Sequence, residues 1–218
     1  MRIDDLALLR LLQLFDSQLP VGAFAHSGGI ETYASLGGGL AEVREVLQAQ
    51  IALGWGRSEL AAAHLAWRAE EDGRPLFELA RQLDVMKVVP AVRRASIGLG
   101  QRTLELLRRL YPAAVVDVDP PHHAVVIGAA GCRLGIGVEP LLLAYAQNLA
   151  MGTLSAALRC MPVGPAQAQR LLAEMHGDVA SAVSAALEQP EAALFTCTPA
   201  LDLRSHEQAF LRTRLFQS

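Results

Sequence analysis

Hydrophobic residues recur at helical spacing along most of the chain. Near its start, Leu8, Leu11 and Phe15 follow the i, i+3, i+7 pattern of an amphipathic helix. Asp4 or Asp5 can cap the beginning of this helix. The same period, interrupted by glycine and proline, predicts further helices downstream. The expected helices cover 6–15, 22–36, 40–54, 57–71, 76–89, 91–110, 140–160, 165–175 and 179–187.

Only two stretches, 113–118 and 124–128, have the β-branched composition of strands. Two isolated pieces of this length cannot form a stable sheet, so we expect loops there, or helix where the second one continues. The expected fold class is therefore all-α, a single-domain helical bundle of about eight to ten helices over residues 1–218.

The composition is that of a soluble globular protein. Of the 218 residues, 52% are hydrophobic and 19% are charged, so a core needs no disulfide or metal support. The net charge of -3 argues against a broad nucleic-acid-binding face. The most apolar window, 124–151, is broken by Arg133, Glu139 and Pro140, so we expect buried core there and no membrane span. The acidic start of the chain lacks the features of a secretory signal and predicts a cytoplasmic protein.

Several kinds of chemistry find no support in the sequence. Cys132, Cys160 and Cys197 are far apart and predict neither a disulfide framework nor a zinc clip. Lys87 is the only lysine, and it has no glycine before it and no hydroxyl residue after it, which excludes a Walker-type nucleotide site. The glycines of 98–100 lack the preceding strand of a dinucleotide motif. We therefore expect no cofactor.

Basic residues gather in one helical stretch. Between Lys87 and Arg109 there are six of them against one acid, Glu105. Such a run is typical of a solvated helix face, and the alternative is a site for an acidic partner. The residues alone leave both interpretations open.

Two groups of polar residues are candidates for chemistry. His122 and His123 could hold nickel or zinc together with a third ligand, but neighbouring histidines seldom face one ion, and anchoring of a loop is the alternative. His26, Ser27 and Glu31 resemble the parts of a nucleophile, base and carboxylate set. Their close spacing keeps them from converging on one substrate atom, so we expect packing rather than hydrolysis from this group.

The C-terminal stretch 201–218 mixes arginines with Phe210, Leu215 and Phe216. Arginine and aromatic residues are typical of interface anchors, and a chain end is seldom ordered unless it docks. Docking on a partner, with ordering on binding, and docking on its own bundle are both open.

Four stretches resemble, in this order, the motifs of the UreF family of urease accessory proteins. They are 19–31 (LPVGAFAHSGGIE), 94–100 (RASIGLG), 122–128 (HHAVVIG) and 161–172 (MPVGPAQAQRLL). The end of the chain also keeps the family's register at Asp202, Leu203, Ser205, Arg214, Leu215, Phe216 and Ser218. The resemblance therefore extends over nearly the whole chain.

The sequence departs from the family pattern at several positions. Gln208 and Ala209 stand where the family has a His-Glu pair, and Arg212 replaces a usual tyrosine. Pro165 and Ala168 also differ from the family's loop sequence. We expect either a tail that docks with a local shift or a tail whose contacts have changed.

The resemblance implies an all-helical, homodimeric scaffold that is not an enzyme. Such a scaffold binds the accessory protein UreD, also called UreH, and recruits or regulates the GTPase UreG so that nickel reaches apo-urease. The partner-binding residues that it implies are Pro20, Gly22, Phe24, His26, Ser27, Glu31, Arg94, Arg102, Arg214, Leu215 and Phe216. Arg94 and Arg102 are also candidates, by charge alone, for an arginine that acts beside the phosphates of the GTPase, and the alternative for both is ion pairing within the bundle. The alternative function is a nickel-binding carrier that uses His122 and His123.

Overall fold

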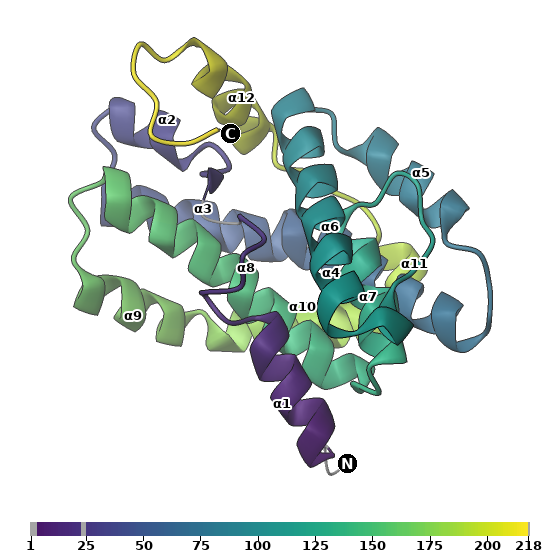
Figure 1. Ribbon diagram of the computed structural model, residues 1–218. Coiled ribbons are helices and arrows are strands. Elements are labelled where there is room, and N and C mark those ends of the chain that lie inside the picture. Colours follow the sequence, from purple (N-terminus) through teal and green to yellow (C-terminus); the bar gives the residue numbers. More distant parts are fainter. Residues whose placement is uncertain (1–3, 23–24, 218) are drawn as a thin grey trace.

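The computed structural model describes residues 4–22 and 25–217, and every regular element within them is a helix (Figure 1). The all-α prediction is therefore confirmed. The α-helices are α1 (Asp5–Leu14), α2 (Ile30–Ser35), α3 (Leu40–Leu53), α4 (Trp55–Glu71), α5 (Phe77–Met86), α6 (Pro90–Leu110), α7 (His123–Arg133), α8 (Val138–Cys160), α9 (Pro165–Glu174), α10 (His176–Glu188), α11 (Pro190–Ala193) and α12 (Pro199–Glu207). Two 3-10 turns, η2 (Pro112–Ala114) and η3 (Gln208–Phe210), complete the regular structure.

Helix α1 begins where the sequence predicts, because the Asp4 carboxylate accepts a hydrogen bond from the Ala7 amide at 3.3 Å. The helix extends away from the rest of the bundle (Figure 1). One face packs on the body through Leu11 and Leu14, and Arg10 donates to the Leu134 carbonyl at 2.9 Å. The opposite face of α1 is left to solvent.

Helix α4 packs closely against helix α7. Small residues line the contact, including the fully buried Ala62 and Ala63. A Cβ atom added to Gly128 would lie 2.1 Å from the Ala63 carbonyl oxygen, so only glycine allows this approach. Helix α7 also confirms that the β-branched stretch 124–128 is helical within the all-α bundle.

Helix α8 is the one described helix whose length and apolar composition would allow a membrane span. Its inward face is buried in the protein core through Leu141, Leu142, Tyr145 and Leu154, all 0% exposed. The core helix of a soluble protein has the same composition, and the expectation of buried core over 124–151 is confirmed.

The predicted helix over 22–36 is wrong in its first half. Helix α2 begins only at Ile30, and the chain before it turns. Gly22, Gly28 and Gly29 have φ angles of 74°, 58° and 93°, in the left-handed region that glycine adopts without strain. The hydrophobic spacing of this stretch is therefore helical by chance, and the glycines decide its conformation.

Helix α12 is a helix that the sequence did not predict, because the stretch 201–218 is only loosely amphipathic. Its first residue is Pro199, and proline is favourable at the first position of a helix. From α12 the chain folds over α2, so the C-terminal segment lies beside residues from the start of the chain (Figure 1).

Candidate partner-binding site

Glu31 joins the two ends of the chain. We call residues 19–31 the signature segment and residues 201–217 the C-terminal segment. The Glu31 carboxylate is buried and accepts hydrogen bonds from the Leu215 amide at 2.5 Å, from the Phe216 amide at 3.4 Å and from the Gln208 side-chain amide at 2.9 Å. A carboxylate with three donors fixes the path of the C-terminal segment.

Gln208 bridges both segments. Its side chain is 1% exposed, and its carbonyl oxygen accepts a hydrogen bond from the Ser27 hydroxyl at 2.9 Å while its amide donates to Glu31. The backbone amide of Gln217 adds a bond to the Ala25 carbonyl at 2.7 Å. Although Gln208 departs from the family pattern, its side-chain amide forms hydrogen bonds with both Ser27 and Glu31.

Close packing accompanies these hydrogen bonds. A Cβ atom added to Gly29 would lie 2.8 Å from the Ser205 hydroxyl oxygen, so helix α12 crosses directly over this glycine. The Thr32 hydroxyl donates to the Arg204 carbonyl at 2.8 Å. The C-terminal segment thus packs against its own bundle in this structure. Binding to a partner stays a prediction.

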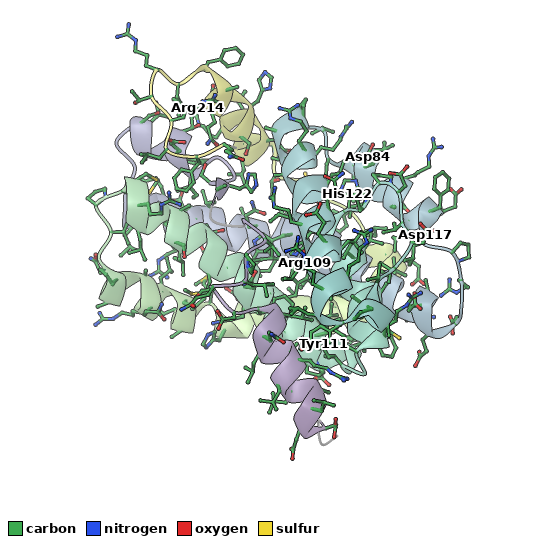
Figure 2. The ribbon with its side chains drawn as sticks, in the orientation of Figure 1. Asp84, Arg109, Tyr111, Asp117, His122 and Arg214 are labelled. Carbon is green, nitrogen blue, oxygen red and sulfur yellow. The ribbon has the colours of Figure 1, made fainter. Side chains whose placement is uncertain are left out.

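The last residues divide between core and surface. Phe216 is 4% exposed and lies 4.4 Å below the Arg159 guanidinium, at the wall of a cavity of about 430 Å³ between α1 and α8. Leu215 is 64% exposed, and Arg214 is also exposed on the C-terminal loop (Figure 2). Phe216 is therefore an anchor of the tail, whereas Arg214 and Leu215 are available to another molecule.

The remaining predicted residues of the signature segment differ in their exposure to solvent. Pro20 and Gly22 are exposed, and Ser27 is buried. Phe24 lies outside the described residues. His26 is half-buried, and its burial, followed by the charge of Arg102, lowers the pKa of its imidazole.

Arg102 and Arg94 differ in their surroundings. Arg102 is half-buried and donates through Nε to the Val21 carbonyl at 2.5 Å, which holds the signature segment on α6. Arg94 is exposed, two turns away on the same helix. The candidacy of both for a GTPase site stays a prediction.

The two neighbouring histidines have separate partners. His122 is completely buried and its two ring nitrogens lie 3.1 Å from the Ser96 hydroxyl and 3.2 Å from the Asp84 carboxylate (Figure 2). His123 instead lies 3.3 Å from the Tyr145 hydroxyl. Within the described residues no group of three or more histidine, cysteine, aspartate or glutamate side chains could hold a metal ion. Both histidines anchor the start of α7.

A buried polar chain continues from His123. Tyr145 donates to the Glu59 carboxylate at 3.1 Å, and Glu59 forms an ion pair with Lys87. Burial raises the pKa of the Glu59 carboxyl, but the charge and hydrogen bond of Lys87 outweigh this effect and the net pKa is lowered. The pKa of His123 is lowered to about 4, chiefly because burial disfavours its charged form. Sequence reasoning missed this group because its members come from four separate elements.

Comparison with known proteins identifies the family of this chain. A sequence model of the UreF family matches residues 39–176. The chain belongs to the UreF family. UreF proteins are urease accessory proteins, which implies a role in urease maturation.

Several UreF proteins are similar to the chain over almost its full length. The protein named urease accessory protein UreF from Chromohalobacter salexigens is 33% identical over 99% of this chain and 96% of its own length. The UreF of a Polaromonas species is 31% identical over 97% of this chain and 95% of its own length. The UreF of Haemophilus influenzae strain PittEE is 29% identical over 95% and 94%.

Proposed function

We propose that this chain is a scaffold of urease maturation that binds UreD (UreH) and recruits or regulates the GTPase UreG, so that nickel is delivered to apo-urease. The supporting observation is the buried Glu31 carboxylate, which holds the C-terminal segment in one conformation. This conformation leaves Arg214 and Leu215 exposed beside each other. The chain itself acts as no enzyme in this scheme, acts in the cytoplasm, and assembles as a homodimer.

The proposed contact with UreD is the outer face of the C-terminal segment. Leu203, Phe210 and Leu215 are 54%, 77% and 64% exposed there, and Arg214 adds a cation. Apolar residues with arginine are typical of the centres of protein interfaces. Three large apolar side chains exposed within 13 residues of sequence are therefore consistent with an interface.

Regulation of the GTPase requires differential binding. A scaffold shifts the nucleotide state of UreG only by the difference between its affinities for the two states. The proposal therefore predicts that UreG associates with the chain and UreD more tightly in one nucleotide state than in the other.

The test measures the masses of mixtures of the full chain and UreD by size-exclusion chromatography with light scattering. Leu215→Ser should abolish or weaken the complex, whereas Leu36→Ser, at a site of matched exposure (63%), should leave it intact. The mass of the chain alone checks the homodimer. Equal binding by both variants excludes the C-terminal face as the contact, and no binding by the unaltered chain refutes the scaffold function.

A chain shortened before Asp202 provides a second comparison. This cut removes the buried Gln208 and Phe216 as well as the exposed face, so its thermal unfolding has to be recorded with its binding. Loss of binding by a truncated chain that remains folded supports the proposal. Loss of UreD binding by Leu215→Ser, which keeps the buried Gln208 and Phe216, assigns the contact to the exposed face and not to the anchor beneath it.

A further inference from the structure

Helix α6 carries two arginines on one face beside a small cavity. Arg94, Gly98 and Arg102 are spaced i, i+4, i+8 and therefore lie in line along the helix. They line a cavity of about 170 Å³, which His26 and Gln217 close from the opposite side. The cavity thus lies where α6, the signature segment and the C-terminal segment meet.

The charge of this cavity is not compensated within the described residues. Among the described residues no acidic side chain lines it, and none of their ion pairs includes Arg94 or Arg102. The adjacent Arg93 does have a partner, Asp84, at 3.8 Å. Two guanidinium groups in one concave site therefore give a local positive potential.

The geometry of Arg102 leaves donors for a ligand. Its Nε is occupied by the Val21 carbonyl, whereas its Nη1 and Nη2 atoms lie 3.5 Å and 3.8 Å from the position of a Cβ added to Gly98. The missing side chain of Gly98 keeps this part of the helix surface open between the two arginines. Guanidinium groups bind carboxylates and phosphates through paired N–H donors.

We propose that this cavity, which we call the α6 anion pocket, binds an oxyanion of the carboxylate or phosphate type. Its volume is below the roughly 300 Å³ of pockets that enclose drug-sized ligands, so one anionic group enters and a larger molecule stays outside. The anion is either free inorganic phosphate or a carboxylate from an acidic side chain of a protein partner. The proposal does not depend on the assignment of UreD or UreG as partners.

The first experiment is calorimetric titration of the full chain with inorganic phosphate and, separately, with acetate. Sodium chloride keeps the ionic strength constant so that general screening does not mimic binding. We expect saturable binding and about tenfold weaker affinity in Arg94→Gln, because one charge-assisted contact is lost. Arg94 is exposed and therefore tolerates this change. Arg108→Gln, an exposed arginine outside the cavity on the same helix, should bind like the unaltered chain.

A second variant places a competing carboxylate at the cavity itself. Ala91 lines the pocket in the first turn of α6, where an acidic residue is compatible with the helix dipole. Ala91→Glu should therefore abolish binding of added phosphate while the helix persists. Absence of saturable binding to the unaltered chain, or equal weakening in Arg94→Gln and Arg108→Gln, overturns the proposal.

The source of the anion is distinguished in a mixture with UreD or UreG. If the pocket takes a carboxylate of either protein, phosphate competes with assembly of that complex, and the competition is lost in Arg94→Gln. If phosphate changes the assembly of neither complex while calorimetry shows that phosphate binds to the chain, free phosphate is the ligand. Either result supports the pocket, and the calorimetric controls alone decide its existence.

Discussion

Replacement of Glu31 by alanine should release the C-terminal segment while the bundle stays folded. The substitution removes the acceptor of three hydrogen bonds, one from Gln208 and two from the amides of Leu215 and Phe216. A buried donor that loses its acceptor costs about 1–3 kcal/mol. Gln208 and Phe216 are such donors, since they are 1% and 4% exposed, although the Phe216 bond is long at 3.4 Å; the amide of the exposed Leu215 can turn to water and contributes less.

These contributions together predict that the docked segment loses about 2–4 kcal/mol relative to the released one. Because about 1.4 kcal/mol changes an equilibrium tenfold, the released population rises by roughly 30-fold to several hundredfold. Amide hydrogen exchange of residues 215–217 measures this change directly. Glu31→Gln, which keeps the shape and one oxygen, should give a smaller increase.

The matched control is Glu45→Ala, a change at an exposed glutamate of α3. It should leave exchange of the C-terminal amides unchanged. If Glu31→Ala also leaves this exchange within threefold of the unaltered chain, Glu31 does not hold the segment. Urea unfolding of both variants separates local release from loss of global stability.

Three further predictions concern the bundle. Gly100→Ala should destabilise the protein by about 1–3 kcal/mol in urea unfolding, because the added Cβ would lie 1.7 Å from the Pro121 carbonyl oxygen. The control is Gly98→Ala, whose Cβ meets its nearest atom at 3.5 Å and which should be neutral or stabilising by up to about 1 kcal/mol. Equal changes in the free energy of unfolding in both variants would contradict the close packing at Gly100. The pKa of His123 is lowered to about 4 from 6.5, so the contribution of this residue to the free energy of unfolding is fully present above about pH 6.5 and is lost as the pH decreases toward 4, with about 2 kcal/mol lost at pH 5. His123→Gln should flatten this part of a pH series of unfolding curves, and an unchanged slope would exclude His123 as its source. Glu59→Gln should leave the Lys87 ammonium without a counter-charge and lower the free energy of unfolding by roughly 3–5 kcal/mol. It should also speed the acylation of Lys87, measured by mass spectrometry, whereas slow acylation in the variant would show that the amine is protected in another way.

Local sequence signals predicted most of the longer helices because each such helix has its own apolar face and its own end signals. Asp4 caps α1 as expected, and proline marks the beginning of α6 and of α9. The same signals failed at 22–29, where three glycines with positive φ override an apparent period. Periodicity reports the spacing of apolar residues and does not report the backbone conformation that glycine permits.

The candidate site depends on contacts that no local pattern contains. Glu31 and Leu215 are 184 positions apart in the sequence, and Glu59 and Tyr145 are 86 apart. Motif resemblance selected Ser27, Glu31 and Phe216 as important, but their tertiary packing shows that these three hold the C-terminal segment. Gln208 was a departure from the family pattern, and only its two hydrogen bonds explain why an amide is suitable there.

The sequence distance between Glu31 and Leu215 also has a consequence for synthesis of the chain. At about 5–20 residues per second, a ribosome needs roughly 10–40 s to make the 184 residues that separate them. During this interval the Glu31 carboxylate has none of its C-terminal donors, so the rest of the bundle can form before the tail docks. A nascent chain therefore lacks the docked arrangement of its two segments until residues 208–217 have left the ribosome, and this delay separates folding of the bundle from completion of the surface that Arg214 and Leu215 present.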